Sequence, residues 1–545
     1  MGNNAWPEAK WVVNQLRGNG GGGSGAGIAP NNCASIVASK DKDLAMKLYY
    51  TWPEDTIIEG QTIVTVAGCK VVLYEGEDLA DETKGTLLST STIKNEYKTS
   101  PLLISADYFE EGHTYTIHVF PYSDQGVVNR NKNNSVTFVS QIYVLYGCRV
   151  NKNDSNPATR VEYLENCDNA NFEAAKMNYT SGIFEYGSWE DAWFVQGCKP
   201  CMLKYDGTVD YYLDPNDYTK KLDDGTASDI ANTAYEGNAM VEIPLVWLKT
   251  FTEGDYQYYY FSDTQIDSDY HAYPFYNSQG HLMQATYMPI YNGTAISTGG
   301  VTRLRSMSGQ TIMNNVAGTT EITYATNNNP SGIDSPIWHT EVLSDRLLIN
   351  ALLLLIGKST DGQTLFGNGH YTGGSAASSL LKSGTMNTRG LFWGTKGTGN
   401  GVKVFGMENW WGNQWRRIAG YLNVNGTQKI KLTYDKTDGS IVNGYNTTGE
   451  GYITLGNMSP SGAPRGYISD SVVNEYGWFP KTASGSQTTY ECDGLWFNNS
   501  QSNYAVVGGC CSSEFIVGPW CVNLSTAVSF ASWYTGATVS CKPLL

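Results

Sequence analysis

The stretch that decides how the chain is interpreted runs from Phe405 to Arg417 and reads FGMENWWGNQWRR. It places three tryptophans within six positions, with a glycine and an asparagine between them that favour a turn. Tryptophan buries a large apolar area, so a short irregular segment of this kind can anchor a scaffold. We therefore predict that Trp410, Trp411 and Trp415 pack inside a C-terminal domain.

Three further blocks follow this stretch toward the C-terminus: GLWF at 494–497, GPWCVNL at 518–524 and GATVSCK at 536–542. Between them, residues 510–516 and 525–534 are mostly small, polar or singly aromatic. They show little of the alternation or helical spacing that marks a core element. A patterned frame that carries two unpatterned stretches favours a display surface.

These blocks together resemble the C-type-lectin-fold variable proteins of diversity-generating retroelements, the class to which phage tropism determinants belong. The MENxxGNxW core at 407–415 is also similar to the formylglycine-generating-enzyme branch of that fold. The resemblance is strong over the C-terminal block, weak from Met240 to Phe405 and absent from the N-terminal third. It implies a phage tail receptor-binding protein for host attachment, with a variable region at about 494–541 whose codons are mutagenised at template adenines.

The resemblance also divides the C-terminal residues into two groups. In that family, adenine-directed mutagenesis acts on asparagine-type AAY codons and cannot yield tryptophan. The resemblance therefore implies that the tryptophans form the scaffold: Trp410, Trp411, Trp415, Trp496, Trp520 and Trp533. The implied ligand-binding, variable positions are those whose amino acids the codons can reach: Cys510, Cys511, Ser512, Ser513, Phe515, Ile516, Ser525, Thr526, Ser529, Phe530, Ser532, Tyr534 and Thr535. Glu514 is not reachable and is expected to be fixed. The alternative is a lectin-like adhesin region without diversification.

Residues 28–141 predict a separate β-sandwich. The stretches 48–53, 70–74 and 115–120 alternate as strands, and several short strands at this spacing indicate a sandwich. The segment 112–126 resembles the penultimate strand of a fibronectin type III or immunoglobulin-like module. By that analogy Trp52 is the early core tryptophan and Tyr115 forms a tyrosine corner.

Residues 1–27 precede this domain. Pro7 and Glu8 suit the first turn of a short helix over 7–16, and a glycine-rich linker follows at 18–27. A helix on such a leash can dock the chain onto other phage tail proteins. A frayed terminus is the alternative.

Composition limits the functions open to the chain. The net charge of −16 over 545 residues would repel phosphate backbones, which argues against nucleic acid as a partner. We recognise no secretory signal in residues 1–23, and the apolar run at 347–356 is too short to span a bilayer. We expect synthesis in the bacterial host cytoplasm and a place in the virion, without membrane insertion.

The middle of the chain, in a domain expected to span 142–545, carries local signals. Residues 239–251 and 256–261 predict a hairpin, and 335–357 predict a helix that Gly357 ends. Asp206-Gly207 and the glycine-rich 395–401 each predict a hairpin turn rather than a calcium or a phosphate loop. The cysteines of this region leave two interpretations open, a zinc site or buried thiols: Cys148, Cys167, Cys198 and Cys201.

Catalytic motifs are not recognisable: the six histidines form no HExxH pair, and there is no GxSxG elbow. We therefore expect an α+β, mostly β protein that is not an enzyme and needs no metal or cofactor. It would bind a host cell-surface receptor, protein or glycan, and a trimer would raise its avidity. The rival is a formylglycine-generating-enzyme-like oxidoreductase, with copper held by cysteines among Cys510, Cys511 and Cys521.

Overall fold

The computed structural model describes residues 29–33, 36–40, 44–58, 61–76, 86–94, 101–131, 133–140, 143–434, 444–455, 465–499 and 501–544. The predicted helix at 7–16 and its glycine-rich linker lie outside these residues. The described chain is mostly β with few helices, as the composition predicted. In the part that is described, no helix combines the length and apolar character needed to cross a membrane.

The chain divides into two compact units. Unit 1 is Met1–Val144 with Asn166–Asp168, and unit 2 is Leu145–Glu165 with Asn169–Leu545. Unit 1 holds a three-stranded sheet of order β1-β2-β7, a four-stranded sheet of order β6-β5-β8-β9 and the hairpin β3–β4, all antiparallel. Its elements are β1 (Ile36–Lys40), β2 (Met46–Tyr50), β3 (Thr56–Ile58), β4 (Gln61–Val64), β5 (Val66–Glu75), β6 (Thr86–Lys94), β7 (Leu102–Ile104), η2 (Ala106–Tyr108), β8 (Thr114–Ser123) and β9 (Ser135–Val139).

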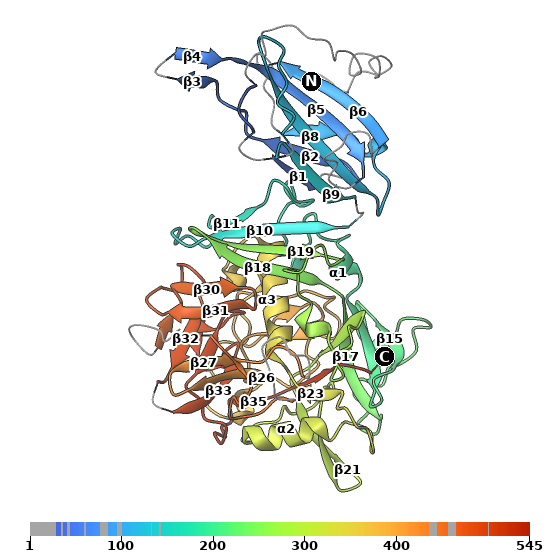
Figure 1. The fold of residues 1–545 in the computed structure, drawn as a ribbon. Coiled ribbons are helices and arrows are strands. Elements are labelled where there is room, and N and C mark those ends of the chain that lie inside the picture. Colours follow the sequence, from blue (N-terminus) through green and yellow to red (C-terminus); the bar gives the residue numbers. More distant parts are fainter. Residues whose placement is uncertain are drawn as a thin grey trace. The chain divides into compact units, whose positions relative to one another are not determined.

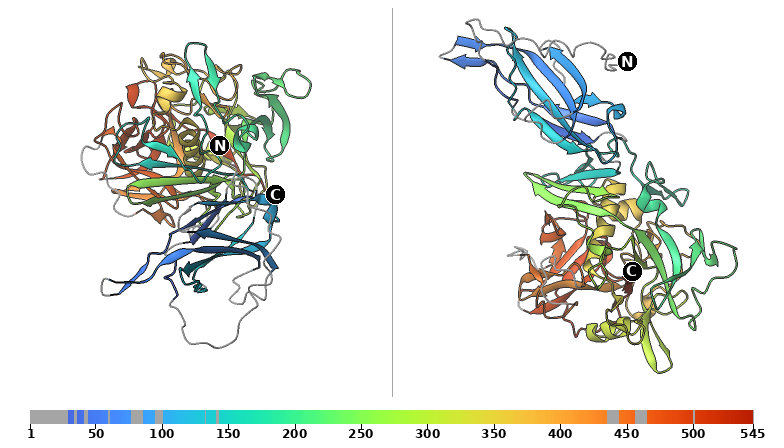
Figure 2. Two further views of the ribbon diagram at one scale, coloured as in Figure 1. Left: turned by 90° about the horizontal axis from the view of Figure 1, so that it is seen from above. Right: turned by 45° about the vertical axis from the view of Figure 1, so that its right-hand side comes forward.

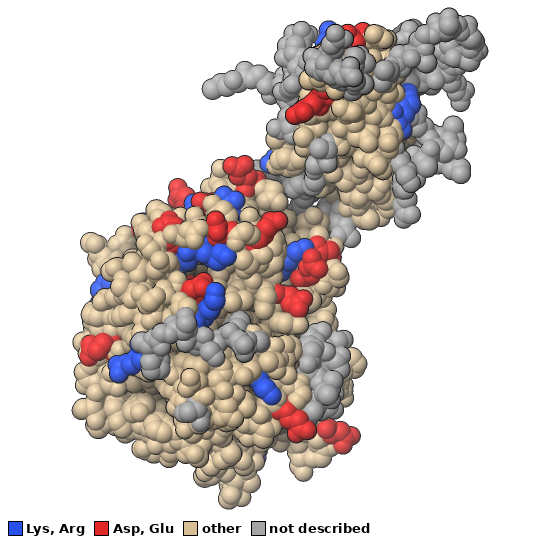
Figure 3. Space-filling model, turned by 60° about the vertical axis from the view of Figure 1, so that its left-hand side comes forward, with Lys and Arg blue, Asp and Glu red and all other residues tan. Residues whose placement is uncertain are grey.

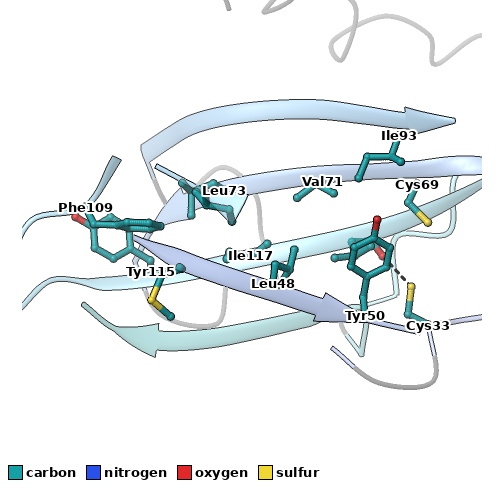
Figure 4. Close-up of a cluster of buried hydrophobic side chains, with 13 residues drawn as sticks. Cys33, Leu48, Tyr50, Cys69, Val71, Leu73, Ile93, Phe109, Tyr115 and Ile117 are labelled. Carbon is teal, nitrogen blue, oxygen red and sulfur yellow. Dashed lines mark hydrogen bonds between the residues drawn. The ribbon is translucent and has the colours of Figure 1, made fainter. Parts of the chain in front are cut away.

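The core of unit 1 lies between these two sheets (Figure 4). Strand β2 alternates between buried and half-buried residues, so Leu48 and Tyr50 point inward and meet Val71 and Leu73 of β5. All three predicted strand stretches lie in strands, although β2 ends at Tyr50 and does not reach the proline at position 53. The hairpin β3–β4 extends from the body of the unit (Figure 2).

Tyr115, at the start of β8, is buried, and its hydroxyl accepts a hydrogen bond of 2.7 Å from the backbone N–H of Glu110. A bond from a strand tyrosine back to the backbone a few residues upstream is the feature expected of a tyrosine corner. Trp52 is half-buried and packs against the same core.

The described residues of unit 2 form three larger sheets. Their orders are β16-β15-β14-β17-β20-β36-β23, β11-β10-β19-β18, and β28-β27-β26-β33-β34-β32-β29 with β35 beside β26. The strands of the first sheet are β14 (Lys199–Lys204), β15 (Val209–Asp214), β16 (Asp217–Lys221), β17 (Gly237–Pro244), β20 (Ala285–Pro289), β23 (Trp338–Thr340) and β36 (Val539–Cys541). Those of the second are β10 (Leu145–Asn151), β11 (Val161–Tyr163), β18 (Trp247–Glu253) and β19 (Tyr256–Ser262). Those of the third are β26 (Trp415–Val424), β27 (Thr427–Ile430), β28 (Ile453–Thr454), β29 (Arg465–Tyr467), β32 (Gly494–Phe497), β33 (Ser502–Val507), β34 (Val522–Leu524) and β35 (Thr535–Gly536).

Four two-stranded ladders and the helices complete the part of unit 2 that the structure describes (Figure 1). The ladders are β12 (Lys176–Asn178) with β13 (Ile183–Glu185), β21 (Thr294–Thr298) with β22 (Val301–Arg305), β24 (Lys403–Val404) with β25 (Met407–Glu408), and β30 (Asp470–Asn474) with β31 (Gly477–Thr482). The helices are α1 (Trp193–Gln196), α2 (Gly318–Thr326), α3 (Leu343–Gly357), α4 (Gly362–Phe366), η3 (Tyr273–Phe275), η4 (Ala377–Ser379) and η5 (Glu514–Ile516).

Helix α3 runs through the interior of unit 2 (Figure 1), and all of its residues except Leu347 are buried. The sequence correctly predicted its end at Gly357 but placed its start at 335, whereas 338–340 form strand β23. Gly357 is needed for close packing, because a Cβ there would lie 2.5 Å from Cδ1 of Leu365. The left-handed residue that ends the helix is Lys358, with φ of 50°.

The predicted hairpin of 239–251 with 256–261 is only half right. Strands β18 and β19 do form a hairpin around Gly254. The first half of the predicted strand, however, is β17, which pairs with β14 and β20 in a different sheet. Pro244 ends β17, since proline has no N–H to donate to a ladder.

Both predicted turns are confirmed. Asp206 and Gly207 lie in the turn between β14 and β15. Residues 395–401 connect Trp393 to Lys403, which exchange backbone hydrogen bonds of 2.9 and 2.7 Å.

Candidate ligand-binding surface

The tryptophan-rich stretch is the centre of a buried polar frame. The ring of Trp410 lies under two guanidinium groups, with Arg346 at 4.1 Å and Arg416 at 4.6 Å from its centroid. Its indole N–H donates to Oδ1 of Asn350 at 2.9 Å. Glu341 forms ion pairs with Arg346 at 3.7 Å and Arg416 at 3.3 Å, so two cations share one carboxylate.

Burial dominates the electrostatics of this frame. It lowers the pKa of Arg346 to about 9, an effect that the neighbouring Arg416 increases and Glu341 opposes. Burial also lowers the pKa of Arg416, again against the attraction of Glu341. Loss of Glu341 would leave two buried guanidinium groups without a carboxylate partner, so the stability of the frame depends on this residue.

The six predicted scaffold tryptophans lie at two depths. Four are buried: Trp410, Trp411, Trp415 and Trp520. Trp496 and Trp533 are half-buried. Trp496 stands edge-on to Trp415, with centroids 5.1 Å apart, and the guanidinium of Arg465 lies 5.5 Å from its ring centroid.

The first unpatterned segment, 510–516, is tied to the frame through its backbone. The N–H of Cys511 donates to the carbonyl of Asn413 at 3.1 Å, and the carbonyl of Cys511 accepts from Gly374 at 2.7 Å. Glu514 has φ of 58°, and its Oε1 accepts a hydrogen bond from the hydroxyl of Thr372 at 2.7 Å. Phe515 packs against Tyr371, with ring centroids 4.5 Å apart.

The second segment, 525–535, is held in the same way. Arg417 donates from Nη2 to the carbonyl of Phe530 at 2.9 Å. The N–H of Gly318 donates to the carbonyl of Val528 at 2.8 Å, and the N–H of Trp415 donates to that of Tyr534 at 2.9 Å. All three bonds are accepted by backbone carbonyls, so none of them uses the side chain at 528, 530 or 534.

The two segments meet over one apolar cluster. Its buried members are Trp415, Val506, Cys510 and Cys521, and the partly buried Trp496 and Tyr534 pack against it. Cys510 comes from the first segment and Tyr534 from the second. The structure therefore brings together two stretches that the sequence could only place separately.

The thirteen predicted ligand-binding positions differ in exposure. Ser512, Ser529 and Phe530 are exposed. Ser513, Phe515, Ser525, Ser532 and Tyr534 are half-buried. Cys510, Cys511, Ile516, Thr526 and Thr535 are buried, and their side chains do not form part of the surface that the other eight line.

Sequence reasoning did not assign Trp496 to this surface. The signal was available in strand β32, where the buried Leu495 and Phe497 flank the half-buried Trp496. Period-2 alternation puts the middle residue on the opposite face from its neighbours. Thr372 and Arg465 carried no comparable signal, because each reaches the surface from a segment distant in the sequence.

The cysteines do not make a metal site where the structure describes them. Among these residues no group of three His, Cys, Asp or Glu side chains is placed to hold a metal ion. Cys148, Cys167, Cys198 and Cys201 are all buried. Burial raises the pKa of Cys511 to about 12 and that of Cys521 well above its ordinary value, so both thiols are protonated at neutral pH when no metal is bound.

Comparison with known proteins gives no family. No family model matches the chain, and no curated protein matches it. Solved structures similar to parts of it include the third fibronectin III domain of the human KIAA0343 protein, at 11% identity and a TM-score of 0.16 over 23% of this chain and 94% of that one. Another is the twitchin kinase region from C. elegans, at 10% identity and a TM-score of 0.16 over 43% of this chain and 39% of that one. Likenesses of this size do not assign a function.

Proposed function

We propose that unit 2 is a C-type-lectin-fold variable domain and that the protein is a phage tail receptor-binding protein for host attachment. The observation that carries this proposal is the meeting of segments 510–516 and 525–535 at the cluster around Trp415. Hydrogen bonds from a buried frame hold both backbones, while hydroxyl and aromatic side chains lie at the surface. That combination suits a binding surface whose side chains change without unfolding the domain.

The surface chemistry supports recognition of a host receptor, protein or glycan. Phe530 and Tyr534 offer aromatic anchors, with ring centroids 6.0 Å apart. Ser512, Ser529 and Ser532 offer short hydroxyl groups that adapt to different partners. Paratopes use the same mixture of aromatic anchors and small polar residues.

Unit 1 supports the same proposal as a fibronectin III or immunoglobulin-like spacer. Its support is the packing of the sheets β1-β2-β7 and β6-β5-β8-β9 on one core, together with the hydrogen bond to the Tyr115 hydroxyl. The N-terminal region would then join the protein to other tail proteins in the virion. Several copies, as in a trimer, would raise the avidity of weak individual contacts.

The first experiment is deep sequencing of the 3′ end of the gene across a natural population. We expect amino-acid substitutions to cluster at codons 510–516 and 525–535, with the tryptophan codons 410, 411 and 415 unchanged. The intervening codons 518–524 are the matched control, because they lie in the same region and encode the frame. Variation that is uniform, or equal in the control codons, would refute diversification.

The binding surface itself is tested separately. A purified chain with Phe530→Ala and Tyr534→Ala should lose attachment to host cells that the unmodified chain retains. Val301→Ala, an exposed apolar residue of the β21–β22 hairpin, is the control. Equal attachment of the double variant and the control would refute the surface as the receptor site.

A further inference from the structure

A concave site lies in unit 2, and none of its lining residues belongs to either C-terminal segment. It is a cavity of about 390 Å³ open to solvent, a volume within the range of small-molecule sites. Its walls include Lys199, Glu242, Pro244, Met283, Tyr287 and Pro543. The first sheet of unit 2 supplies the polar groups.

Strand register explains why these polar groups converge. Lys199 of β14 is directly opposite Glu242 of β17, and Glu242 is directly opposite Tyr287 of β20. Residues directly opposite in an antiparallel ladder project from the same face. The three side chains therefore form one row across three strands.

Two tyrosines fix the carboxylate in this row. The hydroxyl groups of Tyr212 and Tyr287 each donate to Oε2 of Glu242 at 3.0 Å. Burial, and then the charge of Glu242, raises the pKa of Tyr212 to about 12, and the same causes raise the pKa of Tyr287. Both hydroxyls thus stay protonated and act as donors. Among the described residues no donor bonds to the other oxygen, Oε1, which leaves it to accept from a ligand.

Lys199 supplies the complementary donor. Its side chain is exposed, and Nζ lies 5.6 Å from the ring centroid of Tyr212. The cavity thus pairs one cation with one anion, so a ligand with a net charge of either sign meets a repelling group as well as an attracting one. Pro244, Met283 and Pro543 add apolar walls.

We propose that this cavity binds a neutral saccharide. Adjacent sugar hydroxyls can donate to Oε1 of Glu242 and accept from Nζ of Lys199 at the same time. The apolar C–H face of a sugar ring can pack on the ring of Tyr287 and on the prolines. The site is fixed by the sheet, and it does not depend on diversification of the C-terminal segments.

The test uses the full chain and saturation-transfer NMR with methyl β-glucopyranoside, methyl β-galactopyranoside and N-acetylglucosamine as probes. Glucosamine and glucuronate serve as the cationic and anionic comparators. We expect signal from at least one neutral sugar and at least tenfold weaker binding of both comparators. No signal from any neutral sugar, or preference for a charged one, overturns the proposal.

Variants locate the binding. Lys199→Met changes an exposed side chain and leaves the core intact, and Tyr287→Phe removes one hydroxyl. Each should weaken the neutral sugar at least tenfold, whereas Glu190→Gln, an exposed carboxylate outside the cavity, should not. Binding that survives both cavity variants overturns this site. Neither result bears on sequence variation at 510–516 and 525–535, so the two proposals fail separately.

Discussion

Arg417 of strand β26 and Glu321 of helix α2 form an ion pair in which both side chains are almost completely excluded from solvent. The same guanidinium donates to the carbonyl of Phe530, so one buried pair joins a helix, a central strand and a surface segment. Burial raises the pKa of Glu321, and the attraction of Arg417 opposes that shift. The carboxylate therefore depends on its partner.

Removing one member of this pair should be costly. Glu321→Ala leaves a buried guanidinium uncompensated, and we expect the free energy of unfolding of unit 2 to fall by about 3–5 kcal/mol. Urea denaturation followed by tryptophan fluorescence measures it. Asp470→Ala, which breaks the exposed pair with Lys481, is the control and should cost less than about 1 kcal/mol. Equal losses would contradict a structural role for the buried pair.

Tyr115→Phe isolates the bond between its hydroxyl and the N–H of Glu110. Because the phenyl ring keeps the packing, we expect a loss of about 1–2 kcal/mol in local stability of unit 1. Hydrogen–deuterium exchange in the full chain should show faster exchange at the Glu110 amide. Tyr49→Phe, which alters a half-buried tyrosine of β2, is the control. Unchanged protection at Glu110 would show that the hydroxyl is dispensable.

His339 gives the fold a defined response to acid. Burial lowers its pKa to about 3, and the charge of Lys542 lowers it further in the same direction. Well above pH 6.5, the pKa of the unfolded chain, the residue is neutral in both states. Below that, the unfolded chain binds a proton that the folded chain does not, so stability falls by up to about 1.4 kcal/mol per pH unit until about pH 3.

His339→Phe tests this response, because phenylalanine keeps the ring that stacks on Tyr434 at 4.7 Å. The difference in unfolding free energy between the two proteins should be constant above pH 7 and should shift in favour of the variant from pH 6.5 down to 4. A difference that does not change with pH would mean that His339 titrates with the same pKa in the folded and unfolded states.

Neighbouring positions of the first segment provide a matched pair. Cys511 is buried, and a Cβ on Gly374 would lie 2.3 Å from its sulfur, so space is short there. Cys511→Tyr should therefore lower the free energy of unfolding of unit 2 by about 1–3 kcal/mol, because the larger side chain overpacks the site. Ser512→Tyr, at an exposed position, should change it by less than about 0.5 kcal/mol. Similar melting temperatures for both would show that the segment repacks freely.

Local signals in the sequence predicted local structure well. The spacing of leucines identified α3, and glycine with aspartate or asparagine identified the turns at 206–207 and 395–401. The prediction failed where distant partners decide, as at Pro244, where one apparent strand divides between two sheets. Period alone cannot show that β17 pairs with β14 and β20, because that depends on residues tens of positions away.

The candidate surface was likewise predictable only in its local features. The sequence located both unpatterned segments, but it could not show which side chains face outward. Cys510 and Thr535 are small enough to be either exposed or buried. Their contacts with Trp415 and the frame, which the sequence does not show, decide that both are buried. The row of Lys199, Glu242 and Tyr287 was likewise invisible, since it depends on the register of three strands.

The first sheet of unit 2 can be completed only after strand β36, near the C-terminal end of the chain, has been translated. Residues 539–541 lie between β20 and β23, antiparallel to both. While they are still inside the ribosome, both neighbouring strands lack a partner on that side. A reading frame interrupted anywhere in 510–535 would yield a chain that lacks this strand and exposes two sheet edges to proteases. A chain truncated in either segment would thus be open to degradation.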